Sequence, residues 1–141
     1  MAGYSGTPLQ KKLGIKPGAR VVFVNEPPSL RGDLGELPEG VKILKSAAGD
    51  LDFAHAFVKS SAELERQFAK LASQLQPAGM LWISWPKKAS GVATDLNENI
   101  VRDIGLANGL VDVKVCAVDE TWSGLKFVIR VKDRAEAAAR D

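Results

Sequence analysis

Apolar runs along the chain predict six strands. Val21–Val24 is an unbroken apolar run between turn signals, which is typical of a strand buried on both faces. In the run Leu51–Val58, one face carries two phenylalanines and a histidine, and the other carries two alanines and a valine. The remaining strands are expected at Val41–Leu44, Met80–Trp85, Leu110–Val118 and Leu125–Val131.

Other segments have the apolar period of a helix. After Ser60, leucine and phenylalanine recur every three to four residues, and Ser60 and Glu63 have capping-box spacing. This helix is expected to end before Pro77. At the start of the chain, Pro8–Leu13 predicts a short helix, because proline suits the first helical position and Gly14 suits the stop.

The segments between these elements are less regular. Asp95 and Glu98 repeat the capping-box spacing, which predicts a helix that starts near Asp95 and stops at Gly109. The stretch from Glu26 to Gly40 is rich in proline and glycine and is expected to be a loop. About six residues join the strands predicted on either side of Lys45, too few for a helical crossover, so the relative direction of those two strands stays open.

Strands that alternate with helices predict an α/β fold, a Rossmann-like three-layer sandwich with a mainly parallel sheet. The short loop between the last two strands favours an antiparallel C-terminal hairpin. We expect a single domain over residues 1–131 and a charged tail over residues 132–141. The tail has no apolar stripe with which to dock, so it is expected to fray.

Composition excludes several kinds of site and partner. The chain has 141 residues and a formal net charge of +2, which is too small to favour nucleic acid or an anionic membrane as a partner. The single Cys116 excludes a disulfide framework and cysteine-based metal sites, and the single His55 excludes a histidine-rich one, so no metal or other cofactor is expected. With neither a signal peptide nor an apolar run of about 20 residues, the sequence predicts a soluble cytoplasmic protein.

Three stretches of the sequence stand out: Gly3–Leu9 with Lys11–Gly18, then Ala78–Lys88, and then Leu110–Phe127. Together they resemble a bacterial family of small proteins classed as a domain of unknown function. This resemblance implies a bacterial source and supplies no activity. More distantly, the order of elements resembles the Rossmann-like core of class I S-adenosylmethionine-dependent methyltransferases, which close their sheet with an antiparallel hairpin. That second resemblance implies a fold, and a fold does not by itself carry a function.

The turn after the first predicted strand departs from the methyltransferase pattern. Sites for adenosylmethionine and dinucleotides use a glycine-rich turn there, because backbone N–H groups must approach the ligand closely. Here the turn reads Asn25, Glu26, Pro27, Pro28, so two donors are missing and a carboxylate stands where the ligand would lie. Lys45 stands near the end of the second strand, where such sites need an acid for the ribose. We therefore expect no adenosylmethionine or NAD site of the usual form.

A ligand site is nevertheless expected outside the carboxyl ends of the strands, where open α/β sheets bind their ligands. The candidate residues there are Asn25, Trp85, Lys87, Lys88, Asp119, Glu120 and Trp122. In the functional interpretation, two tryptophans wall a cleft, two lysines attract an anion, and Asp119 or Glu120 acts as a general base or cation-binding group. In the structural interpretation, Trp85 caps the sheet, the lysines are solvated and the acids shape the hairpin turn. His55 and Cys116 are expected in the core, since the sequence places no activating partner beside either.

These observations leave two main function classes. The missing glycine turn, metal set and nucleophile–base pair favour a non-catalytic binding or regulatory module that recognises an unknown protein or an anionic small molecule. The alternative is a divergent, transferase-like enzyme that acts on an anionic small molecule through Lys87, Lys88, Asp119 and Glu120. A nucleic-acid accessory role for the basic residues between Lys126 and Arg134 is the weakest of the three possibilities considered.

Overall fold

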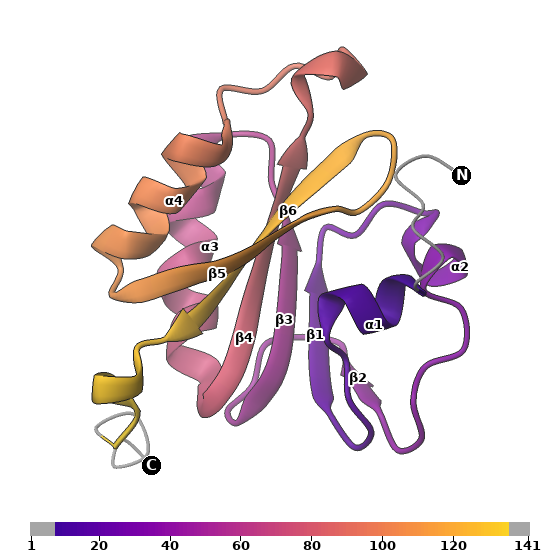
Figure 1. Ribbon diagram of the computed structural model, residues 1–141, viewed down its shortest axis with the longest axis vertical. Helices are drawn as coiled ribbons and strands as arrows, with labels where there is room; N and C mark the ends of the chain where they lie inside the picture. Colours follow the sequence, from indigo (N-terminus) through magenta and orange to yellow (C-terminus); the bar gives the residue numbers. More distant parts are fainter. Residues whose placement is uncertain (1–7, 136–141) are drawn as a thin grey trace.

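A six-stranded sheet runs through the computed structural model, which describes residues 8–135 (Figure 1). Its strands are β1 (Arg20–Val24), β2 (Lys42–Leu44), β3 (Leu51–Phe57), β4 (Leu75–Pro86), β5 (Leu110–Ala117) and β6 (Trp122–Ile129). They lie side by side in the order β2-β1-β3-β4-β6-β5. The first four strands are parallel, and β6 is antiparallel to both of its neighbours. The Rossmann-like sandwich with a mainly parallel sheet and a C-terminal hairpin is confirmed.

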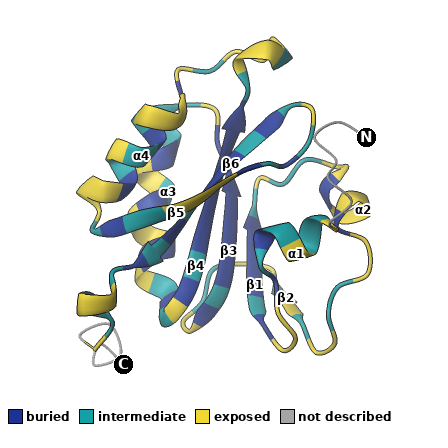
Figure 2. Ribbon diagram, in the orientation of Figure 1, coloured by how far each residue is buried: buried dark blue, intermediate teal, exposed yellow. Residues whose placement is uncertain are grey.

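Helices cover both faces of the sheet (Figure 1). On what we call the back face lie α3 (Ser61–Gln74) and α4 (Glu98–Ala107), and on the front face lie α1 (Leu9–Leu13) and α2 (Leu30–Leu34). Two short 3-10 turns, η1 (Lys88–Ser90) and η2 (Val131–Asp133), follow β4 and β6. Each face has its own cluster of buried apolar side chains, and Figure 2 shows the strands as the most buried part of the molecule.

Strand β3 divides its side chains between these two cores as the sequence predicts. Phe53 and Phe57 belong to the front cluster, with His55 stacked on the Phe57 ring, whereas Ala54 and Ala56 belong to the back cluster. The small alanine side chains leave room for α3, whose buried leucines and phenylalanine pack on this face. The period-2 pattern of this strand therefore assigns its side chains to the two helix layers.

Helix α3 begins where its capping box predicts. The side chain of Ser60 accepts a hydrogen bond from the Glu63 amide at 3.1 Å, and the Glu63 carboxylate accepts one from the Lys59 amide at 3.0 Å. The helix ends at Gln74, and β4 begins at the next residue, Leu75, earlier than the predicted start at Met80. The added part of β4 pairs with β3 irregularly, through a register shift next to Leu51.

The predicted start of the next helix near Asp95 is wrong. Helix α4 begins at Glu98, and its N-cap is Asn97, whose side chain accepts a hydrogen bond from the Ile100 amide at 2.9 Å. Asp95 instead accepts from the backbone and the hydroxyl of Ser61, at 2.8 and 3.1 Å. The carboxylate therefore caps α3, where the helix dipole favours a negative charge.

Strands β2 and β3 are parallel, which settles the direction that the sequence leaves open. Both flank β1, and β2 is aligned only with the first half of β1, from Arg20 to Val22. The distance from the end of β2 back to the start of β3 is therefore short enough for residues 45–50 to span. Arg20 holds that connection, because its amide donates to the Asp52 carboxylate at 2.8 Å and its guanidinium to the Gly49 carbonyl at 3.1 Å.

Strand β6 begins at Trp122, before the predicted start at Leu125. The turn is tightened by Asp119, whose Oδ1 accepts from the amides of Thr121 and Trp122 at 2.8 and 2.7 Å. Most of the tail predicted over residues 132–141 lies outside the described residues. Within residues 8–135, no helix has the length and apolar character needed to span a membrane.

Candidate functional site

The parallel strands end at one edge of the sheet, which we call the carboxyl edge. The strand order reverses at β1, because the chain adds β2 on one side of it and β3 on the other. In open α/β sheets, ligands bind outside the strand ends at such a reversal. Asn25 follows β1 at this point, and Lys87 follows β4 two strands away.

The turn after β1 is fixed by an ion pair. Asn25 is exposed and has a φ of 56°, a left-handed conformation that asparagine tolerates better than most residues. Both carboxylate oxygens of Glu26 accept from the Arg31 guanidinium, at 2.6 and 3.0 Å. The guanidinium carbon lies 5.2 Å from the centre of the Phe23 ring. The Glu26 charge is therefore paired within the protein and is not free for a ligand.

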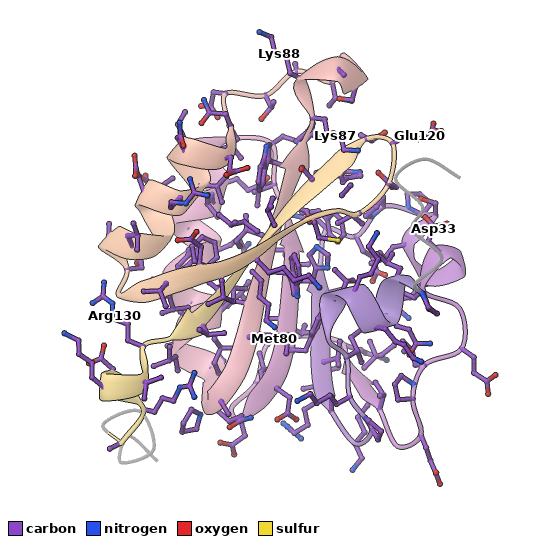
Figure 3. The ribbon with its side chains drawn as sticks, viewed as in Figure 1. Asp33, Met80, Lys87, Lys88, Glu120 and Arg130 are labelled. Carbon is purple, nitrogen blue, oxygen red and sulfur yellow. The ribbon has the colours of Figure 1, made fainter. Side chains whose placement is uncertain are left out.

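Lys87 fastens the β5–β6 hairpin to the end of β4. Its amide donates to the Thr121 carbonyl at 2.7 Å, and its Nζ donates to the Asp119 carbonyl at 2.6 Å. Figure 3 shows Lys87 beside the hairpin turn that carries Glu120. The structure thus brings together three of the residues that the sequence singles out, on two elements far apart in the chain.

Two charged groups at this edge keep their side chains free. Lys88 and Glu120 are exposed, and neither side chain forms a hydrogen bond or ion pair within the described part of the chain. In Figure 3, the Lys88 side chain points away from the sheet edge into solvent. Asp119 is different, since its Oδ1 is used by two amides of the turn.

The two tryptophans do not wall a common cleft. Trp85 is 5% exposed and belongs to the back cluster, whereas Trp122 is 9% exposed and belongs to the front cluster. In the β4–β6 register Trp122 is opposite Pro86 and not Trp85, and neighbouring residues of a strand point to opposite faces. Trp122 packs edge-on against Phe57, with ring centroids 5.1 Å apart.

His55 has a buried partner that sequence reasoning missed. Its Nε2 lies 2.7 Å from the Ser84 hydroxyl, and its ring is stacked on Phe57 with centroids 4.3 Å apart. Both residues are 0% exposed, and burial lowers the pKa of His55 to about 3. Only the register of β3 against β4, which is a long-range property, could have revealed this pair. His55 is thus a core histidine.

Cys116 is also a core residue, as expected. It is 7% exposed on the front face, and its thiol lies 3.3 Å from the Ala117 carbonyl. Across residues 8–135, no group of three or more histidine, cysteine, aspartate or glutamate side chains is arranged to hold a metal ion.

Two substitutions of Asp119 distinguish the hydrogen bonds that its side chain accepts from the negative charge that it carries. We expect Asp119→Ala to destabilise the fold by about 1–2 kcal/mol, because two turn amides lose their acceptor. Asp119→Asn keeps Oδ1 and should cost less than half as much. Urea denaturation of both variants measures the difference, and equal losses would contradict the turn-shaping role.

Comparison with known proteins shows a fold and no family. No family model matches the sequence, and no curated protein sequence is significantly similar to it. The bacterial family that the sequence resembles therefore stays a prediction. Among solved structures, the magnesium protoporphyrin IX methyltransferase of Synechocystis PCC 6803 with bound S-adenosylmethionine (SAM) superposes with a TM-score of 0.57 at 13% identity, over 86% of this chain and 74% of that one.

Two further methyltransferase structures give similar values. A SAM-dependent methyltransferase from Aquifex aeolicus matches with a TM-score of 0.57 at 16% identity, over 84% of this chain and 86% of that one. A ribosomal protein methylase from Lactobacillus delbrueckii subsp. bulgaricus matches with a TM-score of 0.58 at 12% identity, over 86% and 74%.

These neighbours correct the function predicted from the sequence. The main interpretation, a non-catalytic binding or regulatory module, is contradicted by structural neighbours that are methyltransferases. The fold-level resemblance is confirmed: the chain has the fold of class I SAM-dependent methyltransferases.

Proposed function

We propose that this chain is a divergent enzyme with the class I methyltransferase fold, which transfers a group to or from an anionic small molecule at the carboxyl edge of the sheet. The fold supports the reaction class only as an analogy, because one fold can carry many functions. The residues at the edge supply the argument for the site.

One observation carries the proposal: Lys87 ties the hairpin turn to the end of β4. Its two hydrogen bonds, 2.7 Å to the Thr121 carbonyl and 2.6 Å to the Asp119 carbonyl, hold the turn at the carboxyl edge. The unpaired carboxylate of Glu120 and the unpaired ammonium group of Lys88 are therefore carried by segments that are joined to each other. On connected segments of a ligand-binding edge, a proton acceptor can activate an attacking group and a cation can hold an anionic substrate.

The methyl donor of the structural neighbours does not fit the turn after β1 in its usual mode. Pro27 and Pro28 have no N–H to offer, and both oxygens of Glu26 are taken by Arg31. The amide of Leu30 is also used, by the Pro27 carbonyl at 3.0 Å. At the end of β2, Lys45 stands where a carboxylate would hold the ribose. We therefore assign no step to SAM.

The residues of this chain have separate roles in the proposal. Lys88 attracts the anionic substrate, and Glu120 accepts a proton from the attacking group. Lys87 and Asp119 position the hairpin, and Asn25 offers an amide side chain from the end of β1. Trp85 packs in the back cluster and Trp122 in the front cluster, where they support β4 and β6, respectively.

The experiment follows small molecules in an extract by mass spectrometry, in the presence of the full chain and with or without added SAM. We expect an anionic compound to be consumed in excess of the protein, because an enzyme turns over and a binding module does not. Glu120→Gln and Lys88→Ala should lower the rate by about 100-fold and 10-fold, respectively.

Lys70→Ala is the matched control for the lysine. Lys70 is exposed on α3, on the back of the molecule, and its loss changes the net charge equally. The proposal fails if no compound is consumed beyond one equivalent of protein in either arm. It also fails if the control slows turnover as much as Lys88→Ala does.

A further inference from the structure

The outer edge of β5 is an unpaired sheet edge with an unusual surface. Within the described residues, β5 pairs with β6 and has no strand on its other side. Val113, Lys114 and Val115 are all exposed, and the two valines are 55% and 52% exposed (Figure 2). Such an edge is a template for another strand unless something blocks it.

Three lysines gather on the front face beside this edge. Lys114 and Lys126 are directly opposite each other in the β5–β6 register, where like charges destabilise a sheet. The Nζ of Lys114 donates to the Lys12 carbonyl at 2.8 Å. Lys16 lies close enough to act on Lys126, because burial first, then the charges of Lys114 and Lys16, lower the pKa of Lys126.

No acid of the described chain forms a salt bridge with these lysines. Among residues 8–135, the salt bridges join Arg31 to Glu26 and Arg102 to Glu98 and Asp112, and none includes Lys16, Lys114 or Lys126. The fold therefore keeps a repulsive arrangement next to an open edge. An anionic partner would remove the repulsion.

We propose that β5 is the docking edge for an extended acidic segment of a partner protein, which adds a strand to the sheet. Side chains of an added strand alternate between the two faces. On the front face, its carboxylates would lie beside Lys114, with Lys126 one strand further in. On the other face, its apolar side chains would cover Val115, which the register places opposite the back-face residue Leu125.

The charge pattern disfavours a second copy of the chain as the occupant. Antiparallel pairing of two β5 edges centred on Lys114 would oppose two like charges, with Lys126 of each copy one strand behind them. Protection of the edge against aggregation accounts for Lys114, which is on the edge strand, but not for Lys126 and Lys16, which are not. Lys126 lies on β6, one strand inward, so its charge cannot block the edge but does increase the attraction for an anionic partner.

Fluorescence anisotropy with labelled synthetic peptides tests the proposal. The probe alternates valine with glutamate, and the matched peptide alternates valine with glutamine. We expect the acidic peptide to bind about tenfold more tightly, and the variant with Lys114→Glu and Lys126→Glu to lose this preference. The variant with Lys42→Glu and Lys70→Glu has the same net charge and should bind like wild type.

A third peptide, N-methylated on alternate amides along one edge, tests strand addition itself. It should lose binding, because it cannot donate to β5. If it binds like the unmethylated peptide, lysines attract the anion without strand pairing, and the proposal is overturned. Equal binding of the glutamine peptide, or a dimer of the chain that the acidic peptide dissociates, also overturns it. If the double variant fails to fold, Lys114→Gln at its exposed position replaces it.

Discussion

Gly105→Ala is expected to destabilise the protein by about 3 kcal/mol, although alanine is the better helix former. Gly105 is buried in α4, and a Cβ built there would lie 2.0 Å from Cε1 of Phe127. The Phe127 ring cannot move aside, because Phe68 of α3 packs edge-on against it with centroids 5.1 Å apart. Helix propensity alone predicts a gain of about 1 kcal/mol, so packing and propensity predict opposite signs.

Gly32→Ala in α2 is the matched control. Gly32 has no atom within 4 Å of an added Cβ and no positive φ, so alanine should stabilise the protein by about 0.5–1 kcal/mol. Urea denaturation measures both variants. Adding Phe127→Leu to Gly105→Ala should recover part of the loss. A Gly105→Ala protein as stable as wild type would contradict the close packing of α4 on β6.

Acid is expected to weaken the fold through His55, before most carboxylates titrate. The ring is fully buried, and its Nδ1 has no hydrogen-bond partner among the described residues, so a second proton would be poorly accommodated. Burial lowers its pKa to about 3, from an ordinary value of 6.5. Because the folded pKa is depressed, this stability is complete above pH 6.5 and decreases as the pH falls toward 3. Between pH 8 and pH 5 the loss is roughly 2 kcal/mol.

Denaturation of wild type and His55→Gln across that pH range measures the effect. His55 is the chain's single histidine, so a loss of stability that begins near pH 6.5 can be assigned to this residue. Wild type should lose stability toward pH 5, whereas the variant should change little. The same slope in both proteins would contradict the prediction. If the variant does not fold, NMR of the wild-type imidazole should show it neutral down to pH 5.

The sequence predicts elements whose signals are local. Helix α3 follows from a cap and an apolar period, and β3 from the alternation of large and small side chains. The hairpin at the C-terminus follows from a short loop between two strands. In each of these cases, the residues that decide the structure are neighbours in the chain.

Contacts between distant segments explain the errors. Asp95 has the spacing of a cap for the helix that follows it, yet it caps the start of α3 at Ser61, 34 residues earlier in the chain. The sequence predicts that Trp122 precedes the last strand, whereas its place in β6 turns it to the face opposite Trp85. The pairing of His55 with Ser84 depends on strand register, which the sequence does not specify.

The same distinction applies to the candidate site. Lys87, Asp119 and Glu120 are predicted to meet because parallel strands end at one edge, and the contacts of Lys87 join their segments. The role of Lys87 as a fastener, with Lys88 left free, depends on side-chain geometry that only the structure supplies. The central claim is that an unpaired carboxylate, as proton acceptor, and an unpaired lysine, as anion-binding group, make the chain an enzyme at this edge.

Turnover in the small-molecule extract, compared between wild type and Glu120→Gln at equal folded fractions, tests this claim most directly. We predict that wild type consumes an anionic compound well beyond one equivalent and that Glu120→Gln consumes little. Consumption that stops at one equivalent in wild type, or that is the same in both proteins, would contradict it.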